Sequence, residues 1–302
     1  MKKKLIIWAA GKINLYLNVL GKYRNGYHKI ESIMQSVTLS DKITLRPIKK
    51  NIKIISNNSK IPLNEKNLCW RAANLFFKRT KIKEGLEIEI YKTIPSGAGL
   101  GGGSADAAAT LVGMDKLFQT KVESSDLLKW ANELGADIPF CLKGGTALVR
   151  GKGEKITPLL SIKDGWIILL YPQIPISTSW AYKKVKVKLT KKKLNIKLIN
   201  ELIEKEGLMG LSPFLYNKLE EVVMEKFPLI KEIKREMLIM GAKGSLMTGS
   251  GSTIFTIVEN REKAKYILHK LQNRGKVYLV QPTDKSLKEE KVENLRSNNK
   301  EG

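Results

Sequence analysis

The sequence predicts an α+β protein of two domains, and three kinds of observation support that fold class. Several segments alternate apolar and polar residues as half-buried strands do, others carry apolar residues at helical spacing, and two glycine-dense stretches lie between such segments. With 302 residues, 42% of them hydrophobic, the chain can build one large or two ordinary domains. We expect an N-terminal domain over residues 1–158, a smaller C-terminal domain over residues 159–283, and a polar, disordered tail over residues 284–302.

The first elements are expected to be strands. Residues 8–20 indicate a strand, a turn and a second strand, because Gly11 and Lys12 interrupt the alternation. The following turn, residues 21–28, carries Tyr27 and His28, which could stack on and hydrogen-bond a base or a sugar. The same two side chains could equally cap an edge of the core, and the residues alone favour that second interpretation.

The next segments continue this pattern and then change to a helix. Residues 30–45 alternate again, with a turn expected at residues 40–41, and a polar strand pair comes next with its hairpin tip at residues 57–60. Residues 67–80 are predicted to form an amphipathic helix. Asn67 is well placed as the N-cap of this helix, which is a sufficient structural explanation for it.

A glycine-rich loop at residues 95–109 is the strongest functional signal in the chain. Five glycines fall between Gly97 and Gly103, after a predicted strand at residues 86–91 and before a predicted helix that begins near Ser104. The apolar residues of that helix repeat at helical spacing as Ala107, Leu111, Met114 and Phe118. Glycines let the backbone approach a ligand, and a helix N-terminus offers unpaired N–H groups and a positive dipole end. The loop therefore predicts an anion site, above all for phosphate.

Three familiar nucleotide-binding patterns do not account for this loop. Gly97, Gly99 and Gly102 satisfy the dinucleotide pattern G-x-G-x-x-G, but the chain continues with the helix-like residues 127–134 instead of a second strand ending in an acid. A Walker A loop would close with Gly-Lys-Ser or Gly-Lys-Thr, which is missing here. The H-R-D and D-F-G motifs of protein kinases are also missing from the sequence.

The later elements include one notable carboxylate. Residues 124–134 are predicted to form a helix that stops at Gly135, and Asp137 then stands on a turn before Pro139. The remaining predictions are a hairpin at residues 144–158, a buried strand at 166–171 that opens the second domain, helices at 197–206 and 218–240, a second glycine-dense stretch at 241–251 and a strand at 253–258.

Composition limits the class of protein and its setting. Cys69 and Cys141 cannot form a disulfide framework or a C-x-x-C metal site, which favours a reduced, cytoplasmic setting. Residues 1–10 resemble a signal peptide, but their apolar run is too short, as is the run at residues 166–171 for a membrane span. The net charge of +25 would suit a nucleic-acid-binding protein, yet the lysines are spread widely, and their densest cluster, residues 183–193, lacks interleaved aromatic residues.

Three segments in this order resemble the GHMP kinases, the family of galactokinase, homoserine kinase and mevalonate kinase. They are residues 9–14, the glycine loop at residues 95–105, and residues 243–251. The resemblance implies a two-domain fold with the active site in the interdomain cleft, and ATP and Mg²⁺ as cofactors. Further likeness, at residues 26–28 and 134–139 among others, is to the family member that phosphorylates the 2-hydroxyl of a cytidine diphosphate-linked methylerythritol.

The resemblance also implies roles for individual residues. Asp137 matches the catalytic base of the family and Lys12 matches its basic partner, an assignment that suits the chemistry of proton acceptance from a hydroxyl. Ser104 is the candidate for coordination of magnesium through its hydroxyl. Contacts with ATP are implied for Asn67, Pro95, Gly97, Gly99, Leu100, Gly101, Gly102, Gly103, Ser104 and Ala105. Contacts with the acceptor substrate are implied for Asn14, Tyr27, His28, Tyr182, Gly249, Ser250 and Gly251, with Tyr27, His28 and Tyr182 around the cytosine.

The expected partner is thus a small-molecule substrate, with no nucleic acid and no membrane, and the protein is expected to be a monomer or a homodimer. Two alternatives remain at this point. One is another GHMP kinase, of the mevalonate or homoserine type, which would have no use for the nucleobase-binding residues. The other, from a different class, is a basic nucleic-acid-binding protein.

Overall fold

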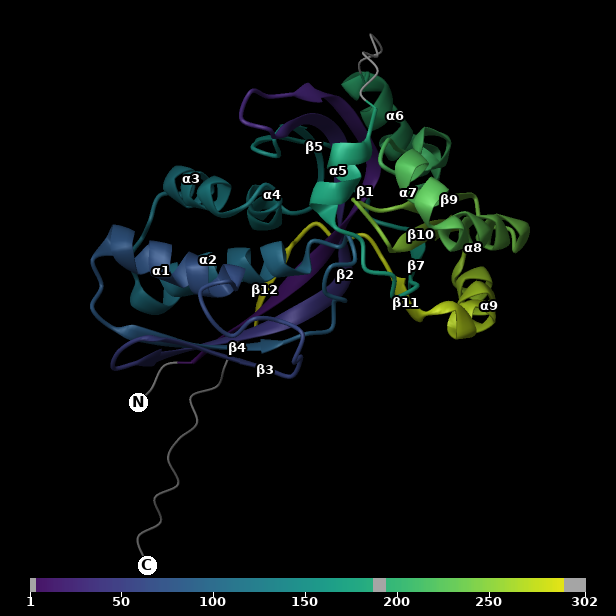
Figure 1. The fold of residues 1–302 in the computed structure, drawn as a ribbon. Coiled ribbons are helices and arrows are strands. Elements are labelled where there is room, and N and C mark those ends of the chain that lie inside the picture. Colours follow the sequence, from purple (N-terminus) through teal and green to yellow (C-terminus); the bar gives the residue numbers. More distant parts are fainter. Residues whose placement is uncertain (1–3, 187–193, 291–302) are drawn as a thin grey trace, which may run out of the picture.

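The computed structural model describes residues 4–186 and 194–290 and contains two β-sheets with helices packed against them. Figure 1 shows the first sheet with helices α1 to α4 on one side of the molecule, and the second sheet with helices α7 to α9 on the other. The sheets have eight and four strands, and the path through the larger one is β12-β1-β2-β4-β3. The structure therefore confirms the predicted α+β class.

Two long strands, β1 (Leu5–Lys22) and β2 (His28–Ile48), form an antiparallel hairpin that runs through the centre of the molecule (Figure 1). The second half of β2 pairs with β4 (Gly85–Tyr91), and its first half pairs with β5 (Thr146–Gly151). Strand β5 continues through a tight turn into β6 (Lys155–Pro158), as predicted. One hairpin thus connects the helix-covered part of the first sheet to the part that borders the second sheet.

The two turns predicted within this hairpin are wrong, because β1 and β2 continue through both positions. At Gly11 the register shifts, and the N–H of Lys12 donates to the carbonyl of Leu100 in the glycine loop at 2.9 Å. At Asp41 the buried carboxylate accepts hydrogen bonds from the N–H groups of Thr93 and Ile94. The residues that interrupt the apolar alternation hold the glycine loop against the strands and do not reverse the chain.

A second correction concerns residues 57–60, which are not a hairpin tip. Strand β3 (Ile52–Ser56) pairs in parallel with β4, so the chain between them must cross over, and it does so through α1 (Leu68–Thr80). Helix α1 packs on α2 (Gly102–Phe118), and a core of buried aliphatic, alanine and aromatic side chains fills the space between these helices and the sheet. Helices α3 (Ser124–Leu134) and α4 (Ile138–Lys143) complete this layer.

The second sheet has the order β11-β7-β10-β9, with strands β7 (Trp166–Tyr171), β9 (Gly244–Met247), β10 (Ile254–Val258) and β11 (Lys276–Val280). Its helices are α5 (Thr178–Lys184), α6 (Ile196–Glu206), α7 (Glu220–Lys226), α8 (Pro228–Ile239) and α9 (Arg261–Leu271), with short 3₁₀ turns at Met209–Phe214 and Gln272–Arg274. The predicted helix at residues 218–240 is interrupted before Pro228, as expected from the missing N–H of proline.

The chain returns to the first sheet twice after residue 158. The short strand β8 (Tyr216–Asn217) pairs in parallel with β1. Strand β12 (Leu287–Glu290) pairs with the start of β1, so the prediction of a disordered tail is wrong for residues 287–290, and residues 291–302 lie outside the described part of the chain. The domain boundary near residue 158 stays a prediction. No helix within the described residues is long and apolar enough to cross a membrane.

Candidate functional site

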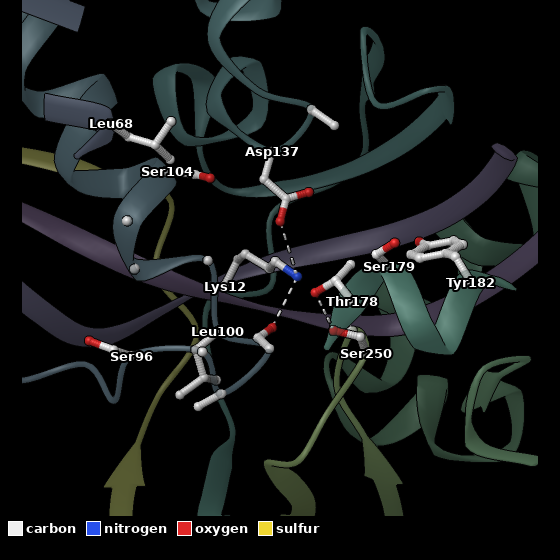
Figure 2. A pocket seen from close by; sticks show the side chains of 18 of the residues that line it. Lys12, Leu68, Ser96, Leu100, Ser104, Asp137, Thr178, Ser179, Tyr182 and Ser250 are labelled. Atoms are coloured by element: carbon white, nitrogen blue, oxygen red, sulfur yellow. Dashed lines mark hydrogen bonds and ion pairs between the residues drawn. The ribbon is translucent and has the colours of Figure 1, made fainter. Parts of the chain in front are cut away.

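One cavity of about 1080 Å³ gathers most of the predicted site residues. Its wall includes parts of β1 and β2 with the turn between them, the segment before α1, the glycine loop, the first turn of α2, the segment before α4, helix α5 and the second glycine stretch. Figure 2 shows this cavity with the side chains of Lys12, Asp137, Ser104 and Tyr182. Every predicted site residue lines the cavity except Ala105 and Gly251, which are buried in the protein.

The glycine loop has the conformation that its composition predicts. Gly97, Gly99 and Gly101 all have positive φ angles, between 67° and 81°, a backbone region that other residues rarely adopt. Helix α2 begins at Gly102, two residues earlier than predicted, and no side chain caps its N-terminus. Backbone N–H groups at this end are therefore free to bind an anion that enters the cavity, and the dipole of a 17-residue helix favours that anion.

Lys12 and Asp137 meet in the cavity as an ion pair. The ammonium nitrogen of Lys12 lies 3.5 Å from Oδ2 of Asp137 (Figure 2). It donates hydrogen bonds to Oδ1 of Asn14 at 2.7 Å and to the carbonyl of Gly99 at 3.1 Å. Lys12 is buried, whereas the Asp137 side chain keeps 33% of its surface exposed. A buried ammonium with three oxygen partners is fixed in place, and the carboxylate beside it stays accessible from the cavity.

Hydrogen bonds to Thr248 and Ser32 fix the position of Asn14, which in turn binds the ammonium of Lys12. Its N–H donates to Oγ1 of Thr248 at 2.9 Å, and its side-chain amide donates to Oγ of Ser32 at 2.8 Å. The amide oxygen of Asn14 accepts from the ammonium of Lys12 at 2.7 Å and, at 3.4 Å, from the hydroxyl of Thr248. The structure thus gives Asn14 a positioning role beside Lys12, while its predicted contact with the acceptor stays a prediction.

The residues predicted to bind the nucleobase line the same cavity, and Figure 2 shows Tyr182 on the other side of Lys12 from Ser96 and Leu100 of the glycine loop. The rings of His28 and Tyr182 are 5.1 Å apart between centroids, and the ring of Tyr27 is exposed, with the ammonium of Lys152 at 5.1 Å from its centroid. Burial foremost, and then the charge of Lys22, lowers the pKa of His28 below its ordinary value of 6.5. The imidazole is therefore neutral at pH 7 and offers one donor and one acceptor.

The second glycine stretch forms another part of the wall. The side-chain amide of Asn217 donates to the carbonyls of Met247 and Gly249 at 2.6 Å and 2.8 Å, which fixes the backbone after β9. The hydroxyl of Ser250 shares a hydrogen bond with that of Thr178 at 2.8 Å (Figure 2). This stretch also touches the glycine loop, since the N–H of Thr253 donates to the carbonyl of Ala98.

Asn67 is the N-cap of α1, as predicted. Its amide oxygen accepts from the N–H of Cys69 at 2.9 Å, and its amide nitrogen donates to the carbonyl of Pro62 at 2.7 Å. The side chain thus clips the preceding loop to the helix, although it also lines the cavity. The predicted contact with adenine remains a prediction.

Several residues that shape the cavity were not identified from the sequence. Lys92 and Asp106 line it and form a buried ion pair, and Thr248 and Asn217 hold the groups described above. The hydroxyl of Ser96 in the glycine loop is buried and has no partner among the described residues. The only sequence signal for Asp106 is an acid in an otherwise alanine-rich first turn, and Lys92 looks like an ordinary lysine at a strand end.

Comparison with known proteins finds family models that match two parts of this chain. The family model described as "GHMP kinases N terminal domain" matches residues 67–145, and the one described as "GHMP kinases C terminal" matches residues 192–277. The chain is 39% identical to a 4-diphosphocytidyl-2-C-methyl-D-erythritol kinase of Clostridium kluyveri over 92% of this chain and 100% of that protein. It is 42% identical to a protein of the same name from Lachnoclostridium phytofermentans, over 85% of this chain and 89% of that protein.

Solved structures show the same similarity. A crystal structure of 4-(cytidine 5'-diphospho)-2C-methyl-D-erythritol kinase matches with a TM-score of 0.79 and 30% identity, covering 93% of this chain and 99% of the other. A homoserine kinase from Cytophaga hutchinsonii matches with a TM-score of 0.75 at 22% identity, over 96% of this chain and 98% of the other, which shows a shared fold. Both family models and the extended similarity to these relatives lead to one conclusion: this chain belongs to the GHMP kinase family.

Proposed function

We propose that this protein is a kinase that transfers the γ-phosphate of ATP to the 2-hydroxyl of 4-diphosphocytidyl-2-C-methyl-D-erythritol. The names of the relatives support the substrate. The observation that carries the proposal is the Lys12–Asp137 pair, which lies in one cavity between an anion-binding loop and a cluster of aromatic side chains. A donor site, a base and an acceptor site are thus available in a single continuous space.

The glycine loop is proposed to hold the phosphates of ATP. The N–H groups at the start of α2 and the buried, unpartnered hydroxyl of Ser96 offer hydrogen-bond donors to phosphate oxygens. Loose, largely dissociative phosphoryl transfer asks the protein mainly for positioning and charge stabilisation, both of which preorganised donors supply. The adenine would extend toward Asn67 at the start of α1, which lines the same cavity.

Asp137 is proposed to act as the general base. As the acceptor hydroxyl attacks the γ-phosphorus, its proton passes to the carboxylate, and the bond from the γ-phosphorus to the bridging oxygen of ADP breaks. The ammonium of Lys12 lies 3.5 Å from Oδ2 of Asp137 and orients the carboxylate, and its own position is fixed by Asn14 and Gly99. The carboxylate is exposed enough to reach a hydroxyl that enters the cavity.

The charge of the cavity suits two polyanionic substrates. Its wall contains six lysines and two aspartates: Lys12, Lys22, Lys66, Lys92, Lys152, Lys183, Asp106 and Asp137. A cationic cleft raises the local concentration of anionic ligands and speeds their capture. We propose that His28 and Tyr182, whose ring centroids lie 5.1 Å apart, hold the cytosine of the acceptor, with Tyr27 contributing from the exposed turn.

The donor groups in the cavity fit a nucleotide-bound Mg²⁺. Within the described residues no three His, Cys, Asp or Glu side chains gather into a metal site. Mg²⁺ commonly takes only one or two protein oxygens and completes its shell with phosphates and water. Ser104, whose side chain lines the cavity, offers such an oxygen. When bound, the ion would neutralise charge on the β- and γ-phosphates.

The proposal is tested by measuring ADP formation with three acceptors in parallel: the cytidine-diphospho substrate, mevalonate and homoserine. We expect turnover with the first and background rates with the other two. Preferred turnover of mevalonate or homoserine would assign the protein to another member of the family. Absence of ADP formation with all three, together with salt-dependent binding to DNA or RNA, would favour the nucleic-acid-binding alternative.

A further inference from the structure

Two oppositely charged side chains flank the glycine loop, residues 95–105, and form an ion pair with each other. Lys92 lies three residues before the loop and Asp106 directly after it, and the ammonium of Lys92 is 2.8 Å from Oδ2 of Asp106. The same ammonium contacts Oδ2 of Asp41 on β2. Both ends of the most glycine-rich segment are therefore joined through one ammonium, and that ammonium is anchored to the sheet. We call these three residues the loop clasp.

The clasp also fixes the chain as it leaves β4. Oδ1 of Asp41 accepts hydrogen bonds from the N–H groups of Thr93 at 2.6 Å and Ile94 at 2.8 Å. All three charged side chains are almost fully buried, with 3% of Lys92, 4% of Asp106 and none of Asp41 exposed. Buried, charge-assisted hydrogen bonds of this kind are strong and little affected by salt.

Stability alone does not explain this arrangement. Two carboxylates share one ammonium, and Oδ1 of Asp106 is buried without a partner among the described residues. Burial foremost raises the pKa of Asp106, although the charge of Lys92 opposes that rise, so the carboxylate is held at a cost. Buried ion pairs can often be replaced by apolar residues without loss of stability, so a cluster that is not fully satisfied needs another reason.

The position of the clasp supplies that reason. A Cβ atom at Gly102, the first residue of α2, would lie 3.1 Å from the ammonium of Lys92, so the clasp adjoins the helix end at which the phosphates are proposed to bind. Lys92 and Asp106 also line the cavity. Because Asp41 and Asp106 together carry at least as much negative charge as Lys92 carries positive charge, Lys92 adds little net attraction for a phosphate, and its effect must come through the shape of the loop.

We propose that Lys92 is a positioning residue which, through Asp41 and Asp106, closes the glycine loop into its phosphate-binding shape before ATP arrives. This inference rests on the proposed function, in which the loop holds the phosphates of ATP. A loop containing five glycines loses much conformational freedom when it is fixed, and a clasp present in the free protein removes that loss from the binding step.

The test compares Lys92→Met, Asp106→Ala and Asp106→Asn by direct binding of ATP, binding of the cytidine-diphospho acceptor, and hydrogen exchange of the loop amides in the free protein. We expect Lys92→Met and Asp106→Ala to weaken ATP binding by about tenfold or more and to speed loop exchange, because released residues must be reordered on binding. Binding of the acceptor should change by less than about twofold, the size of a neutral substitution. Asp106→Asn keeps an acceptor for Lys92 and should restore most of the ATP affinity.

Arg46→Met is the matched control. Arg46 also pairs with two carboxylates, Glu87 and Glu89, across the same two strands, β2 and β4, but it does not line the cavity. It should lower stability without changing ATP affinity. ATP binding equal to wild type in the folded clasp variants, or equal weakening of both ligands, would overturn the inference. If Lys92→Met does not fold, Asp106→Ala decides alone, and failure of wild type to bind ATP would refute the proposed function instead.

Discussion

The two glycine-rich stretches of this protein have similar composition but differ in the element that each leads into and in the use of their backbone groups. The first leads into α2, whose N-terminus has no side-chain cap. The second, residues 241–251, ends in the turn between β9 and β10, where backbone groups bond to one another: the N–H of Thr248 donates to the carbonyl of Thr253 at 2.9 Å, and the N–H of Gly251 donates to the carbonyl of Thr248 at 3.0 Å. One stretch presents free donors to the cavity, and the other is occupied by its own fold.

The glycines of the second stretch serve close packing instead. A Cβ atom at Gly249 would lie 3.0 Å from the carbonyl oxygen of Gly99 and 3.4 Å from the ammonium of Lys12. A Cβ atom at Gly99 would in turn lie 2.3 Å from the carbonyl oxygen of Thr248. We infer that the first stretch binds the donor and the second braces the first against Lys12. Glycine content alone therefore does not identify a phosphate loop, whereas an adjoining helix with a free N-terminus does.

The largest effect is expected where neither stretch can compensate. Neither stretch, residues 95–105 or residues 241–251, contains a carboxylate that could accept the proton of the acceptor hydroxyl, so the proposed base is Asp137, which lies outside both. Asp137→Asn should lower kcat by about 10²–10⁴-fold, the range for loss of a general base, and leave the affinity for ATP within about twofold. Single-turnover phosphate transfer and direct ATP binding would measure the two quantities. Turnover near that of wild type would remove Asp137 from this role.

The contact between the stretches should be the next most sensitive point. Gly99 has a φ of 81°, and a side chain there would meet the Thr248 backbone. Gly99→Ala should lower the free energy of unfolding by about 2–4 kcal/mol, the sum of backbone strain and overpacking. Gly103→Ala is the matched control in the same loop, since it meets only Leu68 at 3.8 Å and should stabilise α2 by about 0.5–1 kcal/mol. Denaturant unfolding of both free variants decides, and equal stability would argue against the bracing contact.

The smallest of these effects should appear at His28, which belongs to neither glycine stretch. His28→Ala should raise the KM of the cytidine-diphospho acceptor by about tenfold, on the scale of one lost base contact, while the KM of ATP stays within about twofold. Steady-state kinetics with each substrate varied in turn would show the difference. Equal increases in both KM values would place the nucleobase pocket elsewhere.

Local patterns predicted most elements of the fold. The amphipathic pattern and Asn67 predicted α1, Gly135 predicted the end of α3, and Pro228 predicted the interruption before α8. The errors fell where a long-range contact decides the conformation. Gly11 and Asp41 look like turn residues in isolation, yet both lie within continuous strands, where Lys12 and Asp41 hydrogen-bond the glycine loop and the segment before it. Strand β3 pairs in parallel with β4 after the crossover through α1, instead of forming a hairpin with the next segment of the chain.

The candidate site shows the same limit. Residue types and the family resemblance identified Lys12 and Asp137, and the structure brings them within 3.5 Å. Neither could identify Lys92, whose importance depends on Asp41 and Asp106 being brought to it from 51 and 14 residues away along the chain. Supporting residues of this kind have no local pattern, because their partners are set by the tertiary fold.

The most direct test of the account traces the phosphate itself. Wild-type protein, ATP, Mg²⁺ and 4-diphosphocytidyl-2-C-methyl-D-erythritol would be mixed and the reaction monitored by ³¹P NMR. We expect the γ-phosphate signal of ATP to be replaced, mole for mole, by ADP and a phosphomonoester whose phosphorus couples to the C2 position of the methylerythritol. Release of inorganic phosphate alone, or a phosphomonoester on another hydroxyl, would contradict the proposed placement of the acceptor beside Asp137.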